Sequence, residues 1–137
     1  MKLPQSGSCQ CGQVRYSLTR EPVGVHICHC TECQKQSGSA FSMTLTVKHD
    51  GVKVVKGALK SFTRVADSGR KMQCFFCPEC GTRIYHAGEV DPDLLRLKPG
   101  TLDDTSWLKP IRQFWTQSRQ PWLDLPSGLQ PFEKQSK

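Results

Sequence analysis

Eight cysteines in this 137-residue chain lie in three groups whose spacing suits metal binding. The first group is a C-x-C pair, Cys9 and Cys11. The second is a C-x-C-x-x-C triad, Cys28, Cys30 and Cys33. The third is a segment that ends in a C-P-x-C-G turn and contains Cys74, Cys77 and Cys80. Zinc prefers thiolate ligands, and a C-x-x-C turn brings two sulfurs to one metal. Pro78 presets φ within such a turn, and Gly81 tolerates the positive φ that follows it. The spacing therefore predicts zinc sites.

The grouping of the cysteines predicts two zinc sites with different roles, one structural and one catalytic. Closed structural sites use four protein ligands, so the first pair and the C-P-x-C-G turn together predict one such site, made by Cys9, Cys11, Cys77 and Cys80. The triad is left with three ligands and an open position, which is typical of a catalytic zinc. In the alternative interpretation Cys74 completes the triad and both sites are structural. Cys74 also fits as a plain buried thiol in an alternating strand.

Polar residues around the triad are candidates for proton transfer and substrate binding. His29 lies between two ligands and is a candidate proton shuttle or fourth ligand, although the pattern favours a structural or solvent-facing histidine. Glu32 is a candidate base near the metal or a solvated side chain. The candidate contacts for carboxylate or amide groups of a substrate are Gln34, Lys35, Ser37 and Ser39.

Metal sites are favoured over disulfides by the beginning of the sequence and by its apolar runs. The first residues contain no apolar stretch of signal-peptide type. The longest apolar run has four residues, 74–77, so no membrane-spanning segment is predicted. We therefore expect a cytoplasmic protein, and in that reducing compartment clustered cysteines bind metal more often than they form bridges.

Composition predicts a small core and a small-molecule partner. Only 30 of 137 residues are Ile, Leu, Val or Phe, so bound metal would supply part of the stability. The formal net charge is +7, but the basic residues are spread along the chain without a block of like charges. That distribution argues against a nucleic-acid surface and is compatible with a small anionic substrate.

Period-two alternation of apolar residues predicts a mostly β domain with little helix. The expected strands cover residues 14–18, 23–27, 41–47, 52–54, 59–65, 72–76, 84–85, 95–97 and 111–116. A short helix is predicted over 31–36, capped by Thr31 and ended by Gly38, with a weaker helical pattern over 103–108. Asp50-Gly51 predicts a hairpin turn. Residues 1–137 are expected to form one domain, whose irregular segment 118–137 is anchored by Trp122, Leu123, Leu125 and Phe132 and frays at its last residues.

With these motifs, the sequence resembles the glutathione-dependent formaldehyde-activating enzyme family, which also includes centromere protein V. The residues that carry the resemblance are Gly7-Ser8-Cys9-Gln10-Cys11-Gly12; Cys28-His29-Cys30-Thr31-Glu32-Cys33-Gln34-Lys35 with Gly38-Ser39; Phe76-Cys77-Pro78-Glu79-Cys80-Gly81-Thr82; and Ser118-Arg119-Gln120-Pro121-Trp122-Leu123 with Gly128 and Leu129. These motifs cover nearly the whole chain. Cys74 is not part of the family pattern.

The resemblance implies a complex fold of short β-sheets with two zinc ions per chain. It implies that Cys9, Cys11, Cys77 and Cys80 hold a structural zinc, and that Cys28, Cys30 and Cys33 hold a catalytic one. The implied activity is that of a carbon–sulfur lyase-type enzyme, S-(hydroxymethyl)glutathione synthase, which joins glutathione to formaldehyde. Two alternatives stay open: a zinc-stabilised binding module without catalysis, and a zinc enzyme of this family that acts on another small electrophile.

Overall fold

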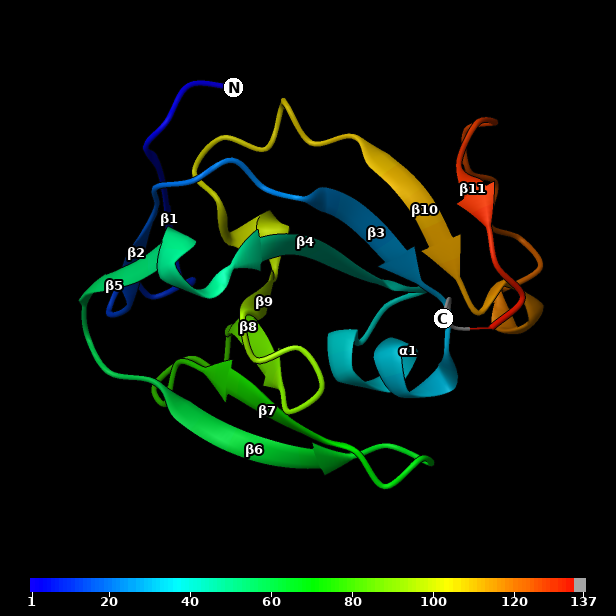
Figure 1. The fold of residues 1–137 in the computed structure, drawn as a ribbon, viewed down its shortest axis with the longest axis horizontal. Coiled ribbons are helices and arrows are strands. Elements are labelled where there is room, and N and C mark those ends of the chain that lie inside the picture. Colours follow the sequence, from blue (N-terminus) through cyan, green and yellow to red (C-terminus); the bar gives the residue numbers. More distant parts are fainter. Residues whose placement is uncertain (135–137) are drawn as a thin grey trace.

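The computed structural model describes residues 1–134 and shows a mostly β fold with little helix, which confirms the predicted fold class (Figure 1). The smaller of its two sheets has the strand order β1-β2-β5, and its strands are β1 (Gln5–Ser8), β2 (Arg15–Leu18) and β5 (Val52–Lys56). The larger sheet has the order β11-β10-β3-β4-β9-β8-β7-β6. Its strands are β3 (Gly24–Cys28), β4 (Ser42–Lys48), β6 (Lys60–Val65), β7 (Lys71–Phe76), β8 (Arg83–Gly88), β9 (Leu94–Leu97), β10 (Pro110–Phe114) and β11 (Gln130–Pro131).

Helical structure is limited to short pieces between the strands. One α-helix, α1 (Thr31–Ser37), follows β3, and the 3₁₀ turns are η1 (His49–Gly51), η2 (Pro99–Thr101) and η3 (Thr116–Ser118). Gly38 ends α1 with φ of 62°, a left-handed conformation that glycine adopts without steric cost. Within residues 1–134 no helix is long and apolar enough to cross a membrane.

The two sheets share one apolar core. Val14, Tyr16 and Leu18 contribute the side chains of the smaller sheet and its preceding turn, and all three are fully or almost fully buried. They pack with buried side chains of the larger sheet, among them Leu45 and Leu97, which are paired across β4 and β9. This core uses one face of the central strands, as the alternation of residues 41–47 predicts.

The opposite face of the larger sheet is polar. Directly paired residues in an antiparallel sheet point to the same side. Successive pairs therefore trace one face across six strands: His26–Thr44, Thr46–Arg96, Arg96–His86, His86–Cys74 and Cys74–Phe62. Helix α1 lies on this face, because the Gln36 side-chain amide donates a hydrogen bond to the Cys74 sulfur of β7 at 3.5 Å. In Figure 1, α1 lies beside the end of β3, and the smaller sheet lies at the other end of the molecule.

Three local predictions differ from the structure. The N-cap of α1 is Cys30, whose sulfur accepts a hydrogen bond from the Cys33 N–H, and not Thr31. Residues 103–108 form turns and no helix. The hairpin predicted at Asp50-Gly51 is also wrong: these residues lie in η1, and the strands on either side belong to different sheets, so the chain crosses between the sheets there.

The segment after η3 is irregular except for β11, which pairs in parallel with β10. Phe132 stacks on Phe114 with ring centroids 5.2 Å apart and so anchors this segment, and Leu123 and Leu125 are half-buried. Trp122 is 70% exposed, so its predicted anchoring role is wrong. The fraying predicted for the last few residues falls largely on 135–137, outside the described residues. Strand β1 was not predicted, since its sequence Gln-Ser-Gly-Ser carries no apolar alternation.

Candidate metal centres

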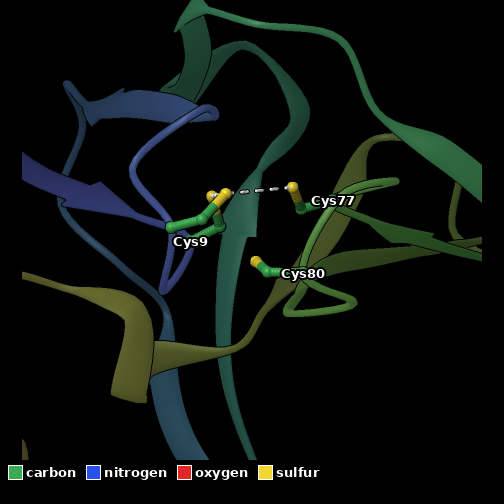
Figure 2. A group of neighbouring side chains, drawn as sticks. Cys9, Cys77 and Cys80 are labelled. Carbon is green, nitrogen blue, oxygen red and sulfur yellow. Dashed lines mark hydrogen bonds between the residues drawn. The ribbon is translucent and has the colours of Figure 1, made fainter.

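The structure brings four cysteines from two distant segments together. Cys9 and Cys11 lie in the turn between β1 and β2 of the smaller sheet, and Cys77 and Cys80 lie in the turn between β7 and β8 of the larger one. All four Sγ atoms lie within 4.8 Å of one another. Figure 2 shows the side chains of Cys9, Cys77 and Cys80 converging from these two turns. The cluster therefore links the two sheets.

Backbone geometry aims the four sulfurs inward. The N–H groups of Gly12 and Gly81 donate to the carbonyls of Cys9 and Cys77 at 3.1 and 2.9 Å, and both glycines have φ near +80°. A side chain is disfavoured at such a φ, which explains the glycine after each cysteine pair. The N–H of Val14 donates to the Cys9 sulfur at 3.2 Å, an interaction that favours the thiolate.

The spacing of these sulfurs fits a tetrahedral zinc ion. Two thiolates at about 2.3 Å from one tetrahedral zinc are separated by about 3.8 Å. The Sγ atoms of Cys9 and Cys11 are 3.5 Å apart, and those of Cys11 and Cys77 are 3.8 Å apart. Hydrogen bonding from the side chain and backbone of Thr82 lowers the pKa of Cys80 to about 5, which favours the ligand form of that thiol.

The second cluster is local in sequence. Cys28 ends β3, Cys30 is the N-cap of α1, and Cys33 lies in the first turn of α1. Their Sγ atoms also lie within 4.8 Å of one another, and within residues 1–134 no other Cys, His, Asp or Glu ligand atom joins this group. Cys33 is buried while Cys28 and Cys30 are half-buried. The three donors suit one metal ion with a coordination position left for another molecule.

The charge state of the triad depends on the cysteines themselves and on nearby cations. Hydrogen bonding to the Cys28 and Cys30 thiols, followed by the Ser42 side chain and the charge of Lys98, lowers the pKa of Cys33. The same contacts with Cys30 and Cys33 raise the pKa of Cys28. Cys33 thus holds negative charge readily, and the proton on Cys28 is one that a divalent metal ion would displace.

Cys74 lies outside both clusters. It is fully buried in β7, where Gln36 donates to its sulfur at 3.5 Å, and it is not among the groups whose ligand atoms converge. The structure therefore gives no geometric support to a four-cysteine site completed by Cys74. Its environment is that of a buried thiol on the polar face of the sheet.

The two candidate proton-transfer residues have contrasting environments. Glu32 is exposed in the first turn of α1, between two triad cysteines. His29 is completely buried; its Nε2 lies 3.0 Å from Oε1 of Gln113, and its ring packs edge-on against Phe41. Neither residue belongs to a cluster of converging ligand atoms.

The four candidate substrate contacts lie on or just after α1 but differ in their surroundings. The Gln34 amide donates to the carbonyls of His29 and Ser118 at 2.7 and 3.0 Å, so its side chain ties α1 to the C-terminal segment. Gln34, Lys35 and Ser39 line an open pocket of about 510 Å³ beside Trp122. Ser37 lines a different pocket of about 430 Å³.

Sequence reasoning missed three residues that the structure places near the triad. They are Ser42, which pairs with Cys28 across β3 and β4, and the cations Lys98 and Arg64, which interact electrostatically with Cys33. Arg64 comes from the edge strand β6, and Lys98 directly follows β9. The alternation of β4 placed Ser42 on the polar face, but only the strand order reveals that β6 and β9 share that face with the triad.

Comparison with known proteins gives the family. The sequence profile of the family described as glutathione-dependent formaldehyde-activating enzyme matches residues 4–118. The chain therefore belongs to this family, which confirms the resemblance found in the sequence. A crystal structure of a Rhodobacter sphaeroides protein has a similar fold, with a TM-score of 0.59 at 20% identity over 74% of this chain and 91% of that chain.

Curated relatives agree with that membership at moderate identity. Proteins of Sordaria macrospora and Penicillium rubens, both under the provisional name of glutathione-dependent formaldehyde-activating enzyme, are 33% and 32% identical to this chain. The matches cover 61% and 66% of this chain. The matched segment spans 37% and 50% of the lengths of those relatives.

Proposed function

We propose that this protein is a zinc-dependent enzyme that joins a thiol, glutathione or a similar one, to a small aldehyde such as formaldehyde. It is a carbon–sulfur lyase-type enzyme in the sense that the same bond breaks in the reverse direction. The observation that carries the proposal is the contrast between a cluster of four converging cysteines and one of three with no further ligand among residues 1–134. The names of the family and of the relatives point to glutathione as the thiol and to formaldehyde as the aldehyde.

The proposal includes two zinc ions in one domain formed by residues 1–137. Cys9, Cys11, Cys77 and Cys80 would hold the structural ion, and Cys28, Cys30 and Cys33 the catalytic one. When bound at the triad, zinc supplies Lewis-acid chemistry at its open coordination position. All eight cysteines are free, which suits the reducing cytosol in which we place the protein.

The reaction is an addition, and its atoms balance without an oxidant. The thiol sulfur bonds to the carbonyl carbon, the carbonyl π bond opens, and the proton leaves sulfur for oxygen. A free thiol has a pKa near 8.5, so a site that favours the thiolate raises the concentration of the nucleophile at neutral pH. The charges of Lys98 and Arg64 provide such an environment near Cys33.

The exposed Glu32 is the better proton carrier of the two candidates. Its carboxylate reaches solvent from the helical turn that holds the triad, so it can exchange protons with water. His29 is buried and has one ring nitrogen engaged with Gln113. We therefore assign His29 a positioning role: its buried ring fixes the backbone that carries Cys28 and Cys30.

Exchange NMR tests the proposed reaction, because glutathione and formaldehyde also combine without a catalyst. Protein loaded with two zinc ions should accelerate exchange between glutathione and S-(hydroxymethyl)glutathione by at least about tenfold over the uncatalysed rate. Neutral and acidic aldehydes in place of formaldehyde test the alternative electrophiles. A protein that carries both metals and accelerates none of these reactions would instead support the zinc-stabilised binding module.

A further inference from the structure

We propose that a cationic pocket beside the triad binds a carboxylate group of one of the two reactants through Lys98 and Arg83. This inference rests on the proposed function, because it assigns a substrate class to the same site. The pocket has a volume of about 430 Å³, within the range of small-molecule sites. Its walls come from the end of α1, the start of β4, the start of β8 and the η2 turn, and they include Gln36, Phe41, Ser42, Arg83, Lys98 and Gly100.

The two cations of this pocket have no acidic partner in the described part of the chain. The ion pairs found there join Arg15 to Asp103, Arg20 to Asp50 and Arg96 to Asp91. The Lys98 ammonium makes one long hydrogen bond, 3.4 Å to the Thr44 hydroxyl. No acidic side chain lines the pocket. The charge of Cys33 compensates Lys98 in part, whereas Arg83 forms no ion pair within residues 1–134. Since a partly buried cation requires a compensating charge or hydrogen bonds, an anion is the complementary ligand of the pocket.

Arg83 is held in a position from which it can bind such an anion. Its guanidinium carbon lies 5.7 Å from the centre of the Phe76 ring, which orients the planar group. The Nη1 atom is buried, and within residues 1–134 it has no hydrogen-bond partner. A guanidinium binds a carboxylate through two parallel hydrogen bonds, and a nearby ammonium adds a further charge-assisted bond.

The pocket lies next to the triad and not at a remote surface. Ser42 lines it and is paired with Cys28 across β3 and β4. Gln36, on the same helix as Cys33, lines it from the other side. The Lys98 charge also acts on Cys33. A small molecule whose carboxylate contacts Lys98 would therefore have its reactive end near the three sulfurs.

The carboxylate has two possible sources, the thiol or the electrophile. Glutathione carries two carboxylates, and an aldehyde acid such as glyoxylate carries one beside its carbonyl. The apolar walls from Phe41 and Pro99 and the small volume suit an organic acid better than a nucleic-acid backbone. Both sources share the same recognition chemistry, and two probes separate them.

The test is calorimetric binding of two probes to zinc-loaded protein, with zinc content measured in every variant. The probes are S-methylglutathione, whose sulfur is blocked, and glyoxylate. Lys98→Met and Arg83→Met should each weaken binding of one probe by about 10- to 100-fold, the range expected for a lost charge-assisted hydrogen bond. Lys98→Arg should recover part of the affinity. The matched control is Lys53→Met, an exposed lysine of β5, which should change the affinity less than twofold.

The outcome for each probe decides a separate question. Loss confined to S-methylglutathione assigns the carboxylate to the thiol, and loss confined to glyoxylate assigns it to the electrophile. Affinities equal to wild type in the Lys98 and Arg83 variants would overturn the inference, as would no binding of either probe to wild type at about 10 mM, about tenfold above the upper end of typical KM values. Binding that depends on Lys98 without any thiol–aldehyde reaction would uphold the pocket and refute the proposed function.

Discussion

The two cysteine clusters differ in how much of the chain each one holds together. The four-cysteine cluster joins a turn of the smaller sheet to a turn of the larger one, and Cys11 and Cys77 within it are 66 positions apart. The three-cysteine cluster spans one strand end and one helical turn, from Cys28 to Cys33. Closing a loop of about 66 residues costs about 2 kcal/mol more in chain entropy than closing one of about five residues. A metal ion in the first cluster would therefore stabilise the fold, while one in the second would stabilise little beyond α1.

The surroundings of the two cysteine clusters also differ. The four-cysteine cluster borders the apolar core, since Cys9 and Cys77 are part of that core. The triad lies on the polar face of the larger sheet, with Lys98 and Arg64 acting on Cys33. A fold can thus use the same ligand chemistry twice, once at a junction of two sheets beside the apolar core and once on a polar face that carries cations.

The largest effect is expected for Cys77→Ser. A structural zinc contributes on the order of 10 kcal/mol to folding, whereas a domain of this size is stable by only about 5–15 kcal/mol. The variant should be unfolded or insoluble, and circular dichroism should show no cooperative thermal transition. The matched control is Cys74→Ser, three residues earlier and equally buried. A cooperative, near-native melt of Cys77→Ser would refute the structural role of the four-cysteine cluster.

Cys30→Ser should separate activity from stability. Serine is a favourable N-cap residue, so the variant keeps the cap of α1 that the Cys30 sulfur provides, and it removes only a metal ligand. We expect a folded protein with one zinc ion instead of two and a thiol–aldehyde reaction slowed by about 100-fold or more. Elemental analysis, a thermal melt and exchange NMR measure the three quantities. Full activity with one zinc ion would end the catalytic assignment of the triad.

Much of this comparison can be predicted from sequence, because the cysteine spacing encodes local geometry. The triad lies within six residues, so one turn of helix suffices to bring its sulfurs together. The C-P-x-C-G turn likewise carries its own geometry in Pro78 and Gly81. The apolar alternation of residues 41–47 identifies the core face of β4, where Leu45 and Val47 are fully buried.

Other features depend on tertiary contacts that no short pattern contains. Strand β1 has no apolar alternation; it exists because it pairs with β2, and Tyr16 lies so close to Gly7 that no larger residue fits there. The cross-sheet passage at η1 resembles a hairpin in sequence, since both use Asp-Gly between alternating runs. Lys98 and Arg83 are unremarkable in sequence and become significant only because the fold places both of them in one pocket with Ser42, which pairs with Cys28 of the triad.

Chelation should release the two zinc ions at different rates. The triad supplies three ligands beside a pocket, whereas the other cluster supplies four, of which Cys9 and Cys77 are fully buried. With a coloured chelator in excess, we expect two kinetic phases of equal amplitude whose rates differ by at least about tenfold. Circular dichroism should stay native through the first phase and change only in the second. Unfolding that accompanies the first phase would contradict the division of roles.

The smallest effect is expected for Cys74→Ser, which tests the four-cysteine alternative for the triad. Cys74 is fully buried, and the serine hydroxyl can still accept the hydrogen bond that Gln36 donates to the sulfur. The remaining cost is that of burying a slightly smaller and more polar group, about 1–2 kcal/mol, which lowers the melting temperature by several degrees. Both zinc ions should remain, because neither cluster includes this sulfur. Selective loss of one zinc ion in this variant, with the other retained, would show that Cys74 is a fourth ligand, close the open position, and remove the main support for catalysis.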